Sequence, residues 1–303
     1  MHKITGVHTA LVTPFDESGL LNENVLREQI RFQLENDIDG LVVLGTTGEA
    51  PTLNKKEKET IIKIAVDENR KTAKPALLTV GTGSYSTSES IDNTSHAKNM
   101  GADCALIVTP YYNKPTQKGI YQHFKAIADA VDIPIIVYNI AGRTGQNLTT
   151  ETLKKLSEIK NIIGVKEASG SLNQMMDVYQ SIVMEREDFC LLSGDDALTL
   201  PAMAIGAHGV ISVLSNLVPQ LIKKLTNYLT VGDFEAARNL HYELLPLFKA
   251  VFIETNPIPI KVAMNHFGMN AGPCRLPLSE LAEENEAILK AVLANYMEFA
   301  EII

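Results

Sequence analysis

The residue with the clearest chemical potential is Lys166, which ends the apolar run IIGVK at residues 162–166. Lysine is seldom fully buried without a partner, and burial favours its neutral amine. A neutral amine can attack a carbonyl and form a Schiff base. On a strand, Lys166 shares a face with Gly164, and we expect this glycine to leave room beneath the lysine stem. For this run alone, a lysine whose head reaches solvent at a strand tip is the alternative.

A tyrosine ends the preceding apolar run, residues 134–138. We expect Tyr138 and Lys166 to end adjacent strands at a similar height and to meet. A phenol beside a Schiff-base lysine could relay protons while the carbinolamine forms and loses water.

Two turns carry groups suited to small anions. The turn GTTGE at 45–49 holds Thr46 and Thr47 between glycines, and its hydroxyl and backbone N–H groups could bind a carboxylate. Arg143 lies in the segment AGRTG, and a guanidinium suits bidentate recognition of a carboxylate. Taken alone, a tight turn with a helix cap downstream and a solvated loop arginine are the better explanations of these two segments.

Other polar residues near strand ends favour structural roles. Tyr112 lies in TPYYNKP, and paired tyrosines beside prolines are more often packing or interface residues. Asp195 and Asp196 could ligate Mg²⁺, but the other strand ends offer no further ligands, so we expect them to cap the next helix. His208 precedes a strand at its amino end and is expected to be structural.

The elements that must position these residues alternate between short apolar runs and amphipathic segments. Near-continuous apolar runs are typical of parallel strands covered on both faces. Eight strand–helix units in roughly 225 residues predict a (β/α)8 TIM barrel, with a doubly wound sheet as the alternative. The predicted strands are 7–12, 40–44, 76–80, 104–108, 134–138, 162–166, 189–192 and 210–213.

The remaining chain predicts helices. Asn54 with Glu57 indicates a capping box that opens a helix over 55–69. After residue 230 the strands cease, and the pattern predicts three helices, over 234–251, 258–266 and 278–302. We therefore predict a catalytic barrel over residues 1–230 and an appended helical segment over 231–303 that packs on it.

The composition describes an ordinary globular protein. The chain has 303 residues, a net charge of −9 and 45% hydrophobic residues, so a nucleic-acid partner is disfavoured. No apolar run approaches the roughly 18–20 residues that span a bilayer, and residues 1–15 lack a signal-peptide pattern. Cys104, Cys190 and Cys274 are few and far apart, which predicts reduced thiols in the cytoplasm.

Taken together, these segments resemble the dihydrodipicolinate synthase / N-acetylneuraminate lyase family of class I Schiff-base barrels, and within it the synthase branch. The resemblance runs nearly the full length of the chain. It rests on an ordered set of five motifs: GTTGE at 45–49, TPYYN at 109–113, GRTG at 142–145, GVKEA at 164–168 and SGDD at 193–196.

The resemblance implies a reaction and its catalytic residues. Lys166 would form an imine with pyruvate, while Thr46, Tyr112 and Tyr138 would relay protons, the tyrosine at 112 arriving from a neighbouring subunit. The enamine would then condense with L-aspartate-4-semialdehyde to give 4-hydroxy-tetrahydrodipicolinate, the first committed step of diaminopimelate and lysine biosynthesis.

It also implies how the substrates bind. Thr46 and Thr47 would hold the pyruvate carboxylate, with help from backbone near Gly194 and Ile211, and Arg143 would receive the carboxylate of the semialdehyde. A homotetramer built from tight dimers is implied, as is a reaction without metal or organic cofactor.

Two departures from the family pattern matter. Ala141 stands where proline is common, which should loosen the loop that carries the arginine. Members that bind lysine at the dimer interface use an imidazole and a small amide where this chain has Lys55 and Tyr85, although Glu89 and Tyr111 are retained. Ammonium repels ammonium and tyrosine is bulkier, so we predict weak or absent inhibition by lysine.

Three alternative functions remain open. An N-acetylneuraminate lyase or a 2-keto-3-deoxy sugar-acid aldolase of the same family would share the lysine, but sialate lyases typically have serine in place of Thr46 and lack Arg143. A catalytically silent relative acting as a sensor or scaffold would lack part of the catalytic set. A metal-dependent aldolase using Asp195 and Asp196 would lose activity with a chelator.

Overall fold

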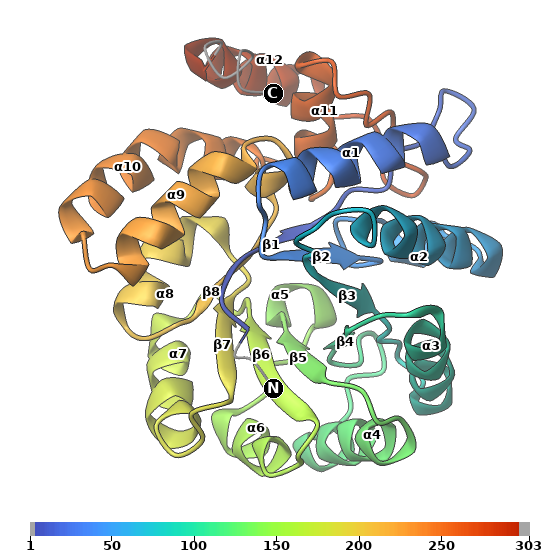
Figure 1. The fold of residues 1–303 in the computed structure, drawn as a ribbon, viewed down its shortest axis with the longest axis vertical. Coiled ribbons are helices and arrows are strands. Elements are labelled where there is room, and N and C mark those ends of the chain that lie inside the picture. The colour runs from blue at the N-terminus through green and yellow to red at the C-terminus, as the bar shows by residue number, and fades with distance from the viewer. Residues whose placement is uncertain (1–3, 297–303) are drawn as a thin grey trace. The chain divides into compact units, whose positions relative to one another are not determined.

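The computed structural model describes residues 4–296. Its strands form a closed parallel barrel in the order β1 to β8 (Figure 1). The predicted TIM barrel is therefore confirmed, and the doubly wound sheet is excluded. The strands are β1 Gly6–Ala10, β2 Gly40–Val43, β3 Leu77–Gly81, β4 Cys104–Val108, β5 Ile135–Asn139, β6 Ile162–Glu167, β7 Cys190–Ser193 and β8 Gly209–Ser212.

Helices follow the strands and continue beyond the last one. They are α1 Glu23–Glu35, α2 Lys55–Asn69, α3 Thr87–Met100, α4 Gln117–Ala130, α5 Ala141–Thr144, α6 Thr150–Ser157, α7 Leu172–Val178, α8 Thr199–Ala204, α9 Pro219–Thr230, α10 Phe234–Ala250, α11 Ile258–His266 and α12 Glu283–Leu293.

Local signals in the sequence account for most of these boundaries. The capping box that opens α2 is present, since Asn54 accepts from the Glu57 N–H and Glu57 accepts from the Asn54 N–H. The helix predicted over 278–302 begins five residues late, at Glu283, because the preceding LPLSELA segment forms no helix. Residues 297–302 of that prediction lie outside the described part of the chain.

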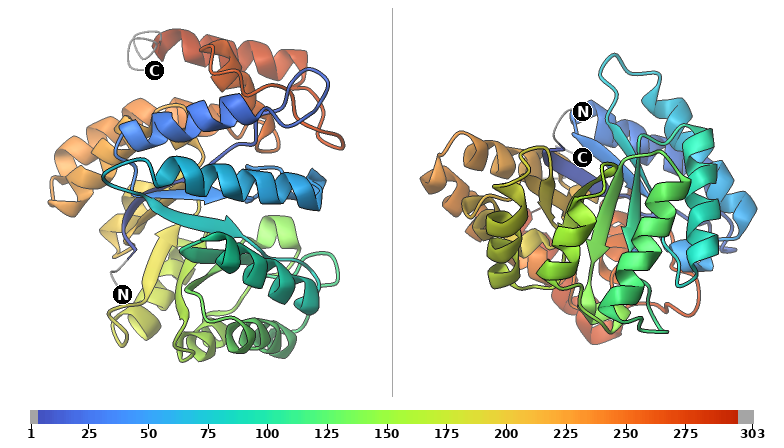
Figure 2. Two further views of the ribbon diagram at one scale, coloured as in Figure 1. Left: turned by 45° about the vertical axis from the view of Figure 1, so that its right-hand side comes forward. Right: turned by 90° about the horizontal axis from the view of Figure 1, so that it is seen from below.

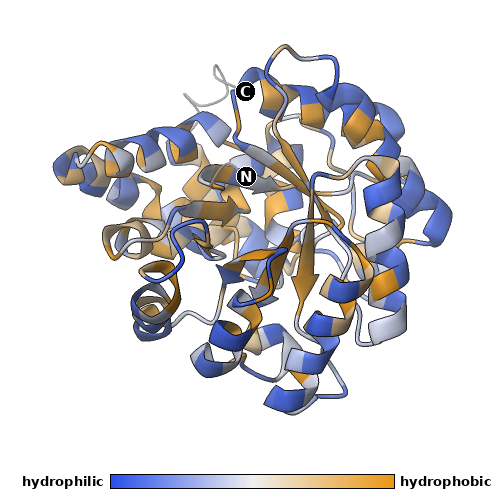
Figure 3. Ribbon diagram, turned by 60° about the horizontal axis from the view of Figure 1, so that its bottom comes forward, coloured by the Kyte–Doolittle hydropathy of each residue, from blue (hydrophilic) through white to orange (hydrophobic). Residues whose placement is uncertain are grey.

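Two compact units make up the chain. The first, Met1–Gly6 with Thr79–Ile211, contains β4 to β7 and most of β8, and it has a core in which apolar residues of α4, α6 and α7 pack on β4 to β7. Seen from below, helices of this unit lie along its strands (Figure 2). Most of the strand residues are hydrophobic, whereas the helices carry both hydrophobic and hydrophilic residues (Figure 3).

The second unit, Val7–Leu78 with Ser212–Ile303, contains α1 and α2 together with the helices from α9 onward. Within it α1 packs on α2, α9 on α10 and α11 on α12. The division into a barrel up to residue 230 and an appended helical segment stays a prediction. No helix in residues 4–296 has the length and apolar character needed to cross a membrane.

Candidate active site

Lys166 lies near the carboxyl end of β6 in the first unit and is buried, with 6% of its surface exposed. Its Cα pairs in register with that of Tyr138 on β5, and its Nζ lies 4.2 Å from the centroid of the Tyr138 ring. The expectation that these two side chains meet is thus confirmed. The pair places an amine against a phenol at the ends of two adjacent buried strands.

The surroundings of the Lys166 side chain differ from those predicted from the sequence. A Cβ on Gly164 would lie 2.0 Å from Cys190 Sγ, so the room that this glycine leaves is filled by the cysteine of β7 and not by the lysine. The glycine that does adjoin the stem is Gly194, where a Cβ would lie 2.9 Å from Lys166 Cε. The prediction for Gly164 was wrong because strand alternation specifies a face, while the neighbour across the sheet decides what fills it.

Tyr112 lies in the segment after β4, and its side chain is exposed to solvent. Its side chain is 90% exposed, and its φ of 69° is rare for a bulky residue. The preceding Tyr111 packs edge-on against Tyr85 with ring centroids 5.4 Å apart. Burial, with Glu89 and Tyr85 nearby, raises the pKa of Tyr111. This segment therefore presents one packed and one exposed phenol.

Arg143 lies on α5, a single helical turn directly after β5. The turn is closed by the Gly145 N–H, which donates to Ala141 O at 2.9 Å, and Gly145 has a φ of 75° that favours glycine. The hydroxyl of the buried Thr144 donates to Ile140 O at 3.1 Å. The arginine itself is exposed, and the looser loop expected from Ala141 stays a prediction.

The GTTGE turn belongs to the second unit. Thr47 is 3% exposed, and its hydroxyl accepts from Asn256 Nδ2 at 2.9 Å. Thr46 is half-buried, and its carbonyl accepts from the Glu49 N–H at 3.0 Å. Each unit thus holds its own part of the predicted site: the threonines here, and the lysine, Tyr138 and the arginine in the other.

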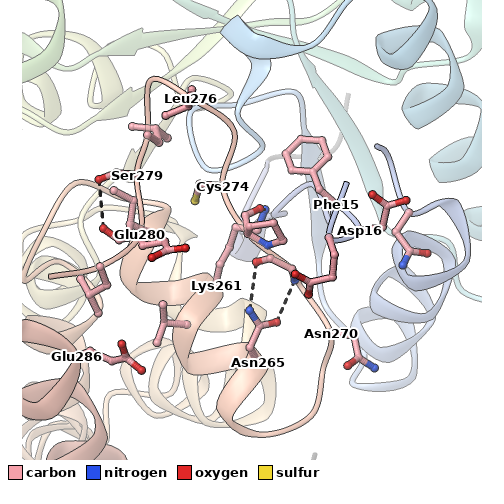
Figure 4. A pocket seen from close by; sticks show the side chains of 18 of the residues that line it. Phe15, Asp16, Lys261, Asn265, Asn270, Cys274, Leu276, Ser279, Glu280 and Glu286 are labelled. Carbon is pink, nitrogen blue, oxygen red and sulfur yellow. Dashed lines mark hydrogen bonds between the residues drawn. The ribbon is translucent and has the colours of Figure 1, made fainter. Parts of the chain in front are cut away.

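Sequence reasoning missed the side chain that anchors this turn, Lys261 on α11. Its Nζ donates to Glu49 Oε1 at 2.9 Å and to the carbonyls of Thr13 and Pro273 at 3.0 and 2.6 Å. It lies in a cleft that is also lined by Phe15 and Cys274 (Figure 4). Burial lowers the pKa of Lys261 although Glu49 opposes the shift. A lysine inside the apolar run IPIKVAM was the signal that could have identified it.

The remaining candidates have structural positions. Asp195 caps a 3-10 turn by accepting from the Ala197 N–H at 2.9 Å, as predicted, and burial raises the pKa of its carboxyl. Asp196, for which a cap was also predicted, is instead the buried first residue of that turn. His208 Nδ1 accepts from the Leu191 N–H at 3.0 Å, which supports its structural reading. Ile211 on β8 is buried. Residues 4–296 contain no group of three or more His, Cys, Asp or Glu side chains that could hold a metal ion.

Comparison with known proteins gives consistent relatives over nearly the whole chain. The model of the dihydrodipicolinate synthetase family matches residues 3–296. A 4-hydroxy-tetrahydrodipicolinate synthase of Protochlamydia amoebophila is 54% identical over 290 residues, which is 96% of each chain.

Solved structures agree with this match. The 4-hydroxy-tetrahydrodipicolinate synthase of Methylacidiphilum fumariolicum SolV superposes with a TM-score of 0.94 at 41% identity and covers 99% of this chain and 98% of its own. A protein described as the first monomeric dihydrodipicolinate synthase variant superposes with a TM-score of 0.93 at 40% identity, covering 96% of both chains. The chain belongs to the dihydrodipicolinate synthetase family.

Proposed function

We propose that this chain is a lyase that condenses pyruvate with L-aspartate-4-semialdehyde through a Schiff base and forms 4-hydroxy-tetrahydrodipicolinate. The observation that carries the proposal is the buried Lys166 with its Nζ 4.2 Å from the Tyr138 ring, at the carboxyl ends of adjacent barrel strands. Barrel enzymes place their chemistry at these strand ends. The relatives reported above carry the name of this synthase, which places the reaction in diaminopimelate and lysine biosynthesis.

The reaction follows from an amine held beside a phenol. The Lys166 amine attacks C2 of pyruvate, and the carbinolamine loses water to give a cationic imine. The imine withdraws electrons, so a methyl proton is lost and an enamine forms. The enamine attacks the aldehyde carbon of the semialdehyde, whose amine then attacks the imine carbon, closes the ring and releases the lysine. We assign proton exchange with the lysine during these steps to the Tyr138 hydroxyl, and the Lys166 Nζ at 4.2 Å from the centroid of the Tyr138 ring supports this assignment.

We assign the proton relay to Thr46, Tyr112 and Tyr138, with Tyr112 supplied by a neighbouring subunit of a homotetramer. An exposed tyrosine in a strained backbone conformation supports this assignment, because strain of this kind persists where a function requires it. Because one relative is described as a monomeric variant, the oligomeric state of this chain should be measured directly.

Substrate binding is assigned to the residues that the family resemblance implies. Thr46 and Thr47 would hold the pyruvate carboxylate, together with backbone near Gly194 and Ile211. The close approach of Gly194 to the lysine stem supports a position beside the imine. Arg143 is exposed on its short helix and would bind the carboxylate of the semialdehyde. We propose that the imine on Lys166 replaces any metal or organic cofactor.

A cytoplasmic location is also proposed. Cys104, Cys190 and Cys274 are free thiols, which suits a reducing compartment. The N-acetylneuraminate lyase and sugar-acid aldolase alternatives are not favoured, because relatives of high identity are named as the synthase.

The first test is chemical trapping of the imine. Borohydride added with pyruvate should modify Lys166 irreversibly, and Lys166→Ala should abolish both the modification and turnover. Lys160→Ala, which removes an exposed lysine just before β6, is the matched control and should behave as wild type. Modification that persists in Lys166→Ala would contradict the proposal.

The second test separates the acceptors. Initial rates with pyruvate and aspartate semialdehyde, read through a coupled reductase, are compared with rates of aldol formation from pyruvate and N-acetylmannosamine. Fast turnover of the semialdehyde alone supports the proposal. A preference for the sugar would retain the imine on Lys166 and exclude the synthase reaction.

A further inference from the structure

A fully buried carboxyl group directly follows the candidate imine lysine. Glu167 is 0% exposed and ends β6. Strand alternation points its side chain to the face opposite that of Lys166. Its carboxyl accepts from three donor groups: from the Ser169 N–H at 2.7 Å, from Asn139 Nδ2 at 3.0 and 3.2 Å to its two oxygens, and from Gln174 Nε2 at 3.0 Å. The donors are all neutral amides, so this buried acid is held by hydrogen-bond geometry.

The same amides continue the network to a second strand end. Asn139 directly follows Tyr138, is also 0% exposed and pairs in register with Glu167. Its Nδ2 donates to Asn147 Oδ1 at 2.7 Å as well as to the carboxyl, and its Oδ1 accepts from the Leu148 N–H at 3.0 Å. The Asn139 side chain thus connects the end of β5 to the segment that follows α5 by hydrogen bonds.

Gln174 on α7 closes the ring. Its Nε2 donates to Leu148 O at 3.0 Å in addition to the carboxyl, and its Oε1 accepts from Asn147 Nδ2 at 2.7 Å. Four side chains therefore form a closed amide–carboxyl ring, in which each one bonds to two others: Asn139, Asn147, Glu167 and Gln174. We call these four residues the amide ring.

The amide ring adjoins residues of the proposed site at two places. Two of its members are the residues immediately after Tyr138 and Lys166, so the ring fixes the strand ends that carry these side chains. The other contacts, at Asn147 and Leu148, hold the far end of the segment that begins at Asn139 and contains Arg143. That segment is thus fastened at both ends to the same ring.

We propose that the amide ring consists of positioning residues that set the place of Arg143 relative to the Lys166–Tyr138 pair. This proposal rests on the proposed function and adds residues that touch neither substrate. Displacement of a substrate-binding group by about 1 Å can cost about 100-fold in rate, so such a ring has a measurable effect on catalysis. A polar network in which every member is bonded also fixes one geometry more strictly than apolar packing does, and two members of this ring, Asn139 and Glu167, are fully buried.

The decisive variant is Asn147→Ala, since this exposed residue lies on the arginine side of the ring and its removal leaves the strand ends bonded through Asn139 and Glu167. We expect the rate of borohydride trapping with pyruvate to stay within about 2-fold of wild type. We expect kcat/KM for aspartate semialdehyde to fall by about 10- to 100-fold. Asn161→Ala is the matched control: that side-chain amide donates to the backbone carbonyls of Ala128 and Val131, at the other end of β6.

Glu167→Gln tests the lysine side of the ring. A glutamine presents one acceptor and one donor to three N–H groups, so the ring cannot close, and both the trapping rate and kcat/KM should fall at least about 10-fold. The reciprocal double variant Glu167→Gln/Gln174→Glu restores a donor and an acceptor between these two positions. It should recover part of the lost activity, whereas a loss caused by general destabilisation would grow in the double variant.

Two results would overturn the proposal. One is an Asn147→Ala variant whose trapping and semialdehyde turnover fall together or not at all. The other is an Asn161→Ala control with the same split between the two readouts. A wild-type protein that forms the imine but does not consume the semialdehyde would refute the proposed acceptor instead. The ring is then judged by trapping alone: slower trapping in Glu167→Gln than in Asn161→Ala supports it, and equal rates exclude it.

Discussion

Replacement of Lys261 by methionine tests how the GTTGE turn is held. Lys261 is 1% exposed, and its Nζ donates to one carboxylate oxygen and two carbonyls, those of Glu49, Thr13 and Pro273. The ammonium also lies 4.5 Å from the centroid of the Phe15 ring. Methionine keeps an unbranched side chain of similar length and removes the charge and all three donors. The variant therefore isolates the polar contribution from packing.

The expected loss is large because the partner stays buried. Removal of one member of a buried ion pair costs about 3–5 kcal/mol, since the other charge loses its compensation. Glu49 keeps the Arg275 backbone N–H at 2.9 Å, which limits the loss, while the two carbonyls lose a donor. We expect a decrease of about 4 kcal/mol in the free energy of unfolding. For a chain of this length that corresponds to a lower Tm by about 6 °C.

The measurement is urea unfolding followed by far-UV circular dichroism, with kcat/KM for pyruvate determined in parallel. The matched control is Lys290→Met, which breaks a half-exposed pair with Glu286 on α12 and should cost at most about 0.5 kcal/mol. Addition of Glu49→Gln to Lys261→Met should recover part of the stability, because a buried amide is less costly than an unpaired carboxylate. The reasoning fails if Lys261→Met is as stable as the control, or if the double variant is no more stable than Lys261→Met.

Three further predictions concern other parts of the chain. Gly164→Ala should lower stability by about 1–3 kcal/mol and slow borohydride trapping, because the new methyl group would lie 2.0 Å from the Cys190 sulfur; unchanged unfolding and trapping would contradict the contact. The Glu68 carboxyl has its pKa lowered from 4.5 to about 2, chiefly by hydrogen bonds from the Arg31 guanidinium and other cations. Its stabilisation should be complete above pH 4.5 and lost as the pH falls toward 2, so Glu68→Gln and wild type should converge in unfolding free energy over that range. Free lysine should inhibit turnover weakly or not at all, and a micromolar inhibition constant in steady-state kinetics would show that Lys55 and Tyr85 accommodate it.

The local sequence pattern was sufficient to predict the helices and strands whose boundaries are set by residues within or next to them. The strand predicted over 104–108 coincides with β4, and the helices predicted over 55–69 and 258–266 coincide with α2 and α11. Each is bounded by a change in hydrophobic pattern or by a cap within a few residues. The start of α12 was misplaced because the apolar residues of LPLSELA mimic one face of a helix.

The parts of the site that sequence reasoning missed depend on residues far apart in the chain. The Thr47 hydroxyl is held by Asn256, which lies 209 positions later, and no short-range signal connects the two. The space at Gly164 is likewise filled from β7 by Cys190, so its role could be known only once the strands had paired. Motif resemblance supplied the residues proposed to face substrate, whereas the residues that hold them required the fold.

The two buried lysines show why a lysine in an apolar run is an incomplete signal. Lys166 and Lys261 share this pattern and are almost equally buried, at 6% and 1% exposure. Lys261 Nζ donates to three oxygen acceptors, which use all three ammonium hydrogens and hold the side chain in place. Lys166 Nζ instead lies against the phenol ring of Tyr138. The acceptors around the nitrogen therefore distinguish Lys261 from the proposed nucleophile Lys166, and trapping with pyruvate should modify Lys166 and leave Lys261 unmodified.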